Sequence, residues 1–208
     1  MIITNIEQQK KNKGRSSVFL DDKFSFGIDD FDLLKLKLKI GMELTDDQLN
    51  EIKETILLSS AKEYSVGLVS KFSYTKKTMT DKLRSRDYDN ETIEKTIRFL
   101  ENYNFIDDLE YAKRFINDAL KIKHFGLKKI KYDLLQKGIN NNVIEEALSD
   151  FDIDTLEENG ILSLARKKIG GNFEYKNIMK TKRYLASKGY SFELVDKTID
   201  FIIHEERE

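Results

Sequence analysis

The sequence has no cysteine, few histidines and no long apolar run. Without cysteine, disulfides and thiolate chemistry are excluded, and a reducing cytoplasm is compatible with the chain. No signal peptide is recognisable and no apolar stretch approaches the ~18 residues that span a membrane, so we expect a cytoplasmic protein with no membrane partner. The net charge is only -1 although 35% of the residues are charged. This balance excludes a uniformly basic nucleic-acid-binding protein but not a protein with a basic face.

Patterns typical of catalysis and cofactor binding are also missing. Neither His124 nor His204 lies in a metal-ligand spacing or beside the Ser or Asp of a nucleophile system. The chain has no Gly-Lys-Ser phosphate loop and no G-x-G-x-x-G run. Acidic pairs such as Asp107-Asp108 are expected to be helix caps and solvated charge. We therefore expect a protein that is not an enzyme and that holds no metal or cofactor.

What the sequence does contain is a repeat with a period of 51 residues. Three segments align without a gap: LRSRDYDNETIEKTI (83–97), LLQKGINNNVIEEAL (134–148) and LASKGYSFELVDKTI (185–199). Such a period indicates stacked supersecondary units. Each segment is typical of two helices joined by a tight corner.

The corner is predicted position by position. A left-handed residue ends the first helix at Asp87, Gly138 and Gly189. An apolar residue then folds back on that helix at Tyr88, Ile139 and Tyr190. An N-cap opens the next helix at Asp89, Asn140 and Ser191. The same local chemistry is therefore built three times.

The N-terminal region follows a different pattern. Near-alternating apolar residues predict a small antiparallel sheet over about residues 2–28, which should lean on a helix because three short strands rarely stand alone. A short helix is expected to end near Gly41, and Thr45 with Gln48 forms a capping-box pattern that starts a long helix reaching about Phe72. We expect a mainly α fold in which three tandem three-helix, helix-turn-helix-like repeats form an elongated curved array. The expected segments are residues 1–44 (sheet and short helix) and the repeats 45–103, 104–153 and 154–208.

Charge is distributed unevenly along each repeat. The second helices are basic, with five basic and one acidic residue in 75–86, four and one in 126–137, and five and none in 175–188. The third helices are mostly acidic, which argues against a DNA reader that inserts the helix after the turn into the major groove. A row of basic second helices would instead suit backbone phosphates or an acidic protein surface. The candidate binding residues are Arg84, Arg86, Lys128, Lys129, Lys131, Lys137, Lys167, Lys168, Lys180, Lys182, Arg183 and Lys188.

Three segments together resemble the bacterial RecX family of recombination regulators. They are NFIDDLEYAKRFI (104–116), FGLKKIKYDLLQKGINNNVIEEAL (125–148) and RYLASKGYSFELVDKTI (183–199). The chain departs from the family pattern at YTKKTM (74–79), where acidic residues are usual, and at Asn104, where glycine is usual.

This resemblance implies a non-enzymatic protein that binds the RecA filament on single-stranded DNA, and we expect the protein to be a monomer. It implies inhibition of ATP hydrolysis, strand exchange and co-protease activity in DNA repair, recombination and the SOS response, together with weak DNA binding. Two alternatives stay open from the residues themselves. One is a freestanding nucleic-acid-binding protein that uses the basic second-helix face, and the other is a helical scaffold for some other partner.

Overall fold

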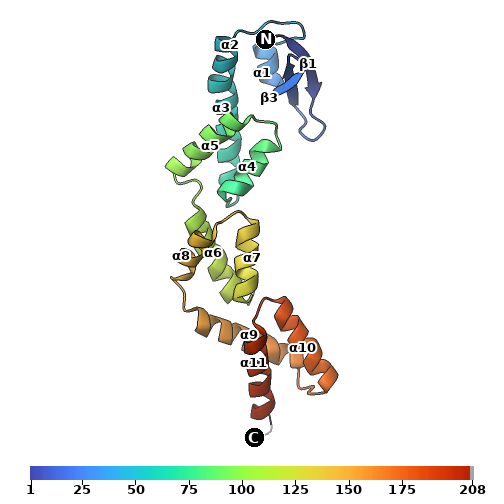
Figure 1. The fold of residues 1–208 in the computed structure, drawn as a ribbon, viewed down its shortest axis with the longest axis vertical. Helices are drawn as coiled ribbons and strands as arrows, with labels where there is room; N and C mark the ends of the chain where they lie inside the picture. The colour runs from blue at the N-terminus through green and yellow to red at the C-terminus, as the bar shows by residue number, and fades with distance from the viewer. Residues whose placement is uncertain (207–208) are drawn as a thin grey trace. The chain divides into compact units, whose positions relative to one another are not determined.

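The computed structural model describes residues 1–206, which are mainly helical with one three-stranded sheet (Figure 1). The predicted mainly α fold is confirmed. The chain divides into two compact units, of which the first is Met1–Asp107 and the second begins at Asp108. Within the described part of the chain, no helix combines the length and apolarity needed to cross a bilayer.

The first unit opens with the predicted antiparallel sheet. Its three strands lie side by side in chain order: β1 (Ile3–Gln8), β2 (Arg15–Leu20) and β3 (Lys23–Asp29). Val18 in the central strand pairs with Ile6 of β1 and Phe26 of β3. Asp21 and Asp22 have φ of 47° and 64°, as a two-residue turn between right-twisted strands requires. The sheet predicted from the alternating residues is therefore confirmed.

The helices that follow the sheet differ in part from the prediction. Helix α1 (Asp30–Lys35) ends earlier than Gly41, because Lys37 turns into the left-handed region at φ 53°. Thr45 and Gln48 form the predicted capping box, with both reciprocal hydrogen bonds present. The long helix contains a π-helical turn that was not predicted, and it ends before Phe72; its parts are α2 (Asp46–Glu51), η1 (Ile52–Leu57) and α3 (Leu58–Val69).

Each repeat consists of three helices around its own apolar core. Repeat 1 contains α3, α4 (Lys76–Arg84) and α5 (Asn90–Asn102). Repeat 2 contains α6 (Asp108–Lys121), α7 (Leu127–Gln136) and α8 (Asn141–Leu148). Repeat 3 contains α9 (Ile153–Ile169), α10 (Tyr175–Ser187) and α11 (Phe192–Glu205). Repeat 1 lies in the first unit, and repeats 2 and 3 lie in the second.

The corner predicted between the second and third helices is confirmed in all three repeats. The left-handed residue has φ of 59° at Asp87, 83° at Gly138 and 95° at Gly189. The buried residue after it donates its amide to the carbonyl five residues back, which is the long bond of a Schellman motif; these bonds join Tyr88 to Leu83, Ile139 to Leu134 and Tyr190 to Leu185. The expected N-caps accept from the amide three residues on, at Asp89, Asn140 and Ser191.

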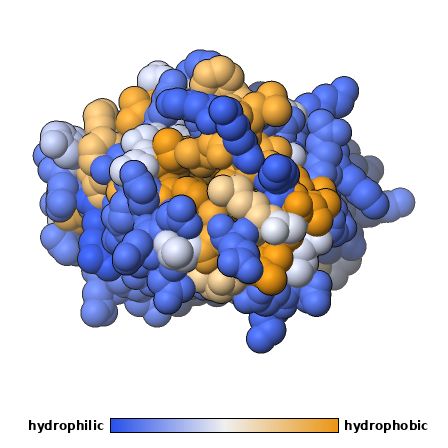
Figure 2. Space-filling view, turned by 90° about the horizontal axis from the view of Figure 1, so that it is seen from above, coloured by the Kyte–Doolittle hydropathy of each residue, from blue (hydrophilic) through white to orange (hydrophobic). Residues whose placement is uncertain are grey.

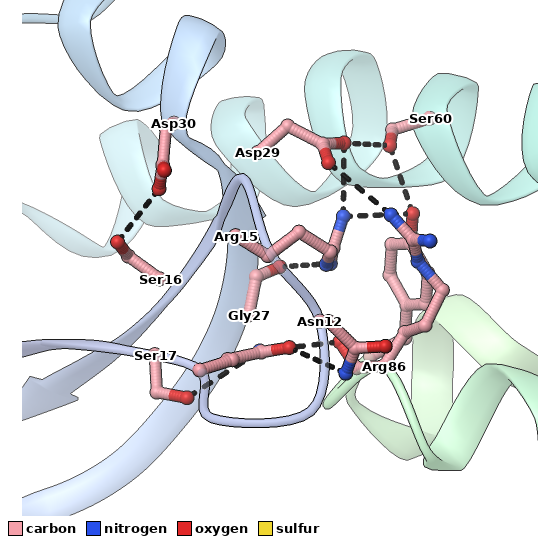
Figure 3. Close-up of polar contacts among 11 residues, drawn as sticks. Asn12, Arg15, Ser16, Ser17, Gly27, Asp29, Asp30, Ser60 and Arg86 are labelled. Carbon is pink, nitrogen blue, oxygen red and sulfur yellow. Dashed lines mark hydrogen bonds and ion pairs between the residues drawn. The ribbon is translucent and has the colours of Figure 1, made fainter.

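The sheet docks on the corner of repeat 1 (Figure 3). The amide of Gly27 donates to the carbonyl of Asp87 over 2.7 Å, and Ser17 Oγ donates to the carboxylate of Asp87 over 3.0 Å. The side-chain amide of Gln9 donates to the carbonyl of Arg86. The expectation that the sheet leans on a helix is confirmed, because Val18 and Phe26 share an apolar core with Leu49, Ile52 and Leu57 of the long helix. The polar contacts described above are made at the end of α4.

A buried arginine holds this contact together. Arg15 is fully buried, and its guanidinium donates to Asp29 Oδ2 over 2.9 Å, to the carbonyl of Gly27 over 2.9 Å and to the hydroxyl of Tyr88 over 3.1 Å. Asp29 also accepts from Arg86 and from Ser60. One carboxylate on the sheet is thereby shared between two guanidinium groups, so both of these charges have a charged partner. The Nε atoms of Arg15 and Arg86 are buried with no hydrogen-bond partner among the described residues.

In the second unit, repeat 2 docks on the corner of repeat 3. The amide of Gly126 donates to the carbonyl of Lys188 over 2.9 Å, and the amide of Lys128 donates to the carbonyl of Gly189 over 3.3 Å. The two backbones approach so closely that a Cβ on Gly126 would lie 2.4 Å from the carbonyl carbon of Gly189. The hydroxyl of Tyr190 donates to the carbonyl of His124. Glycine at these positions is therefore needed for the contact between the repeats.

Candidate partner-binding surface

Two of the predicted basic residues form equivalent ion pairs inside their own repeats. Lys131 lies 2.6 Å from Glu145, and Lys182 lies 2.7 Å from Asp196. The lysines are 51 residues apart in the sequence, as are the acids, and each pair links the second helix of a repeat to the third. Part of the recurring contrast between basic and acidic helices is therefore explained by contacts within each repeat.

Arg86 also has an intramolecular role. Its guanidinium lies 3.3 Å from Asp29 and stacks 4.3 Å from the ring centroid of Tyr64. It is thus part of the contact between the sheet and repeat 1. Arg84, which follows Leu83 on the same helix, is exposed and has Asp81 at 3.6 Å.

Other predicted lysines gather where repeats 2 and 3 meet. The ammonium groups of Lys129 and Lys188 each lie 5.0 Å from the ring centroid of Phe125, with Lys123 at 6.0 Å. Further lysines lie near Tyr184 and Phe192. Rings attract cations through the negative potential of their faces. We call this group the lysine–aromatic cluster; it consists of Lys123, Phe125, Lys128, Lys129, Lys168, Tyr184, Lys188 and Phe192.

Lys123 and Phe125 were not predicted as site residues. They lie in the connection between α6 and α7, where neither helical periodicity nor the repeat singles them out. The only signal in the sequence was a lysine and an aromatic residue within the three positions before the glycine at the N-cap of α7. Lys167, Lys180 and Arg183 are exposed, whereas Lys137 lies 5.7 Å from the ring of Tyr111.

Beside the cluster, a side chain of repeat 3 accepts a hydrogen bond from the first turn of α7. The amide of Leu127 donates to Glu157 Oε1 over 2.6 Å. Burial raises the pKa of Glu157 above its usual value of 4.5, and the hydrogen bond from Leu127 opposes this effect. Burial also raises the pKa of Tyr190, with a further contribution from the charge of Glu157. The Tyr190 hydroxyl therefore stays protonated and able to donate to His124.

A Glu157→Gln substitution is expected to change how stability depends on pH. A carboxyl group with a raised folded-state pKa binds its proton more tightly in the folded protein than in the unfolded chain. Its contribution to the free energy of unfolding is therefore largest below the unfolded-state pKa and falls as the pH rises through the folded-state pKa. Glutamine keeps an acceptor for Leu127 but does not titrate. The free energy of unfolding of the variant, relative to the wild type, should therefore rise as the pH is raised from below 4.5 through the folded-state pKa of Glu157. Urea unfolding at several pH values measures this, and a difference that is flat or falls contradicts it. Glu158→Gln controls for the loss of one exposed charge.

Comparisons with known proteins place this fold in a family. Residues 1–45 match the regulatory protein RecX N-terminal domain, residues 107–148 match the RecX second three-helix domain, and residues 157–199 match the RecX third three-helix domain. A regulatory protein RecX of Clostridium botulinum (strain Alaska E43 / Type E3) is 36% identical over 202 residues, which cover 95% of this chain and 94% of that protein. The chain belongs to the RecX family.

Other RecX proteins agree with this assignment. A regulatory protein RecX of Clostridium beijerinckii is 38% identical over 202 residues, covering 95% of this chain and 93% of the relative. A crystal structure of a regulatory protein RecX superposes with a TM-score of 0.65 at 27% identity, covering 96% of this chain and 98% of that one. RecX from Lactobacillus salivarius gives a TM-score of 0.62 at 29% identity, covering 69% of this chain and 95% of that one. The lysine–aromatic cluster combines residues of the second and third RecX three-helix domains.

Proposed function

We propose that this RecX-family protein is a cytoplasmic, monomeric regulator that binds the RecA filament on single-stranded DNA. Binding would inhibit the ATPase, strand-exchange and co-protease activities of RecA. The observation that carries the proposal is the match to proteins named regulatory protein RecX over 95% of the chain. In this proposed role the protein acts by binding and performs no catalysis of its own.

Two surfaces support a binding role. The lysine–aromatic cluster offers positive charge beside aromatic faces, which suits an anionic surface of protein or nucleic acid. In the first unit, Phe31 and Leu34 of α1 are each 75% exposed. Figure 2 shows apolar side chains gathered within a hydrophilic surround. Apolar patches of this kind mark protein–protein contacts, which favours a protein partner over nucleic acid alone.

The proposal is tested by the ATPase activity of RecA on single-stranded DNA. Addition of the purified protein at or below an equal molar ratio to RecA should reduce the rate of ATP hydrolysis. If neither the hydrolysis rate nor the length of the filaments changes, the proposed function is wrong.

A double charge reversal, Lys128→Glu with Lys188→Glu, is expected to weaken this inhibition. Each hydrogen bond to a charged group contributes roughly 1.5–3 kcal/mol, so the protein concentration for half-inhibition should increase at least ~10-fold. Lys10→Glu with Lys11→Glu, which reverses two exposed charges in the first unit, is the matched control. Equal inhibition by both variants would show that the lysine–aromatic cluster does not bind the filament.

The second candidate is a freestanding nucleic-acid-binding protein, favoured by the aromatic rings among the lysines of the cluster. Such a protein should bind a single-stranded oligonucleotide tightly without RecA, with an affinity that falls steeply as the salt concentration rises. Fluorescence anisotropy at several salt concentrations distinguishes the two functions when it is run beside the ATPase assay.

A further inference from the structure

Repeat 1 has threonine in place of the lysine that pairs with the third helix in the other two repeats, and its second and third helices are joined instead by Lys76 and Glu101, whose charged atoms lie 3.0 Å apart. Lys131 and Lys182 reach from the second helix to an acid on the third. The equivalent position in repeat 1 is Thr80, while the acid is retained as Glu94. A threonine side chain is too short to take the place of lysine, and Glu94 instead lies 3.3 Å from Arg98 on its own helix.

A groove lies at this position between α4 and α5. Its volume is about 440 Å³, and its lining includes the buried side chains of Ile93 and Ile97. The other lining residues are polar or charged and come from both helices: Lys76, Thr80, Arg84, Asn90, Glu94, Arg98 and Glu101. The groove thus offers an apolar surface beside a charged one.

The two arginines of the groove are specific to repeat 1. Arg84 lies on α4 and is 62% exposed, and Arg98 lies on α5 and is 70% exposed. The residues equivalent to Arg84 are Leu135 in repeat 2 and Ala186 in repeat 3, and those equivalent to Arg98 are Ser149 and Asp200. None of them carries a positive charge. Arg84 pairs with Asp81 and Arg98 with Glu94, in each case on the same helix, and exposed pairs of this kind are weak because water and salt screen them. A carboxylate from outside can therefore replace these partners.

We propose that the groove between α4 and α5 binds an acidic segment of a protein partner. An apolar side chain of the segment would pack on Ile93 and Ile97, and a carboxylate beside it would accept from Arg84 and Arg98, whose planar guanidinium groups suit carboxylates. The buried side chains of Ile93 and Ile97 in the groove suit an apolar side chain, which a phosphodiester backbone does not offer, so the groove favours protein over nucleic acid. The inference rests on the proposed function, because that function identifies the partner as the RecA filament.

The chain itself supplies the substitution that tests this inference. Thr80→Lys places in repeat 1 the residue that repeats 2 and 3 carry, so it should pair with Glu94 and fill the groove without disturbing the fold. Binding to RecA filaments on single-stranded DNA should fall at least ~10-fold, with an unchanged unfolding midpoint. Arg84→Glu, which leaves the groove open but reverses one charge, should give a similar loss. Ser59→Lys adds a charge at an exposed position of α3 and should bind as the wild type does. Wild-type binding by both groove variants would overturn the inference.

A second measurement separates the groove from the proposed function. If the wild-type protein does not bind RecA filaments, the proposed function fails, and the groove is tested with a synthetic peptide of alternating Glu and Leu. In the full chain with labelled isoleucine methyl groups, NMR shifts at Ile93 and Ile97 that disappear in Thr80→Lys would support the groove. No shift, or the same shift in both proteins, would overturn it. Shifts produced by a single-stranded oligonucleotide instead of the peptide would overturn the choice of a protein segment.

Discussion

Replacing Gly189 with alanine is expected to destabilise the second unit by about 2–4 kcal/mol. The residue has φ of +95°, where a side chain is strained by roughly 1 kcal/mol. The added Cβ would also lie 2.4 Å from the Cβ and 2.5 Å from the amide nitrogen of Lys129. Forcing an atom into a packed contact costs a further ~1–3 kcal/mol. The helix cannot move away freely, because the amides of Gly126 and Lys128 are bonded to the corner.

Urea unfolding followed by circular dichroism measures this effect. Gly171→Ala is the matched control, because Gly171 has φ of +74° but nothing lies within 4 Å of its added Cβ. The control should show the backbone strain alone, so the difference between the two variants reports the contact between repeats 2 and 3. Equal losses would mean that this close approach does not limit stability.

Replacing Arg15 with methionine is expected to destabilise the first unit by about 2–4 kcal/mol. Removing one partner of a buried charge pair typically costs ~3–5 kcal/mol, and the smaller figure reflects the bonds that Asp29 keeps to Arg86 and Ser60. The hydroxyl of Tyr88 and the carbonyl of Gly27 would also lose a donor. Methionine fills much of the arginine volume, so the loss is mainly polar.

A double-mutant cycle with Asp29→Leu separates the charge from the packing. In the double variant the acid that would have lost its arginine partner is also absent. The loss in free energy of unfolding of the double variant should therefore be smaller than the sum of the losses of the two single variants. The free energies of unfolding from urea titrations supply the cycle. Additive losses would show that Arg15 and Asp29 do not act together.

The corners could be predicted from the sequence because their chemistry is local. At Gly138, Ile139 and Asn140, a left-handed residue, an apolar contact and an N-cap follow one another directly. Local chemistry does not explain why the first corner has Asp87 where the other two have glycine. The reason is tertiary: the carboxylate accepts from Ser17 of the sheet, which offsets part of the strain of a left-handed residue other than glycine.

The candidate surface was predicted only in part for a similar reason. Composition identified the basic second helices, but it could not show that Lys131 and Lys182 are held by acids of the same repeat. Nor could it place Lys123 beside Phe125, because that contact depends on how the chain turns between α6 and α7. A sequence repeat reveals which positions are equivalent, whereas the side chains that contact those positions depend on how the folded helices pack.

The two docked corners use the same acceptors. In repeat 3, the carbonyls of Lys188 and Gly189 accept from the backbone of repeat 2, and in repeat 1 the equivalent carbonyls of Arg86 and Asp87 accept from the sheet. The sheet thus occupies the place that a preceding repeat would occupy. Terminal repeats of a solenoid need a cap, since the face prepared for a neighbour would otherwise be exposed. The N-terminal sheet covers the first corner in this way, since it occupies the backbone acceptors that a preceding repeat would use.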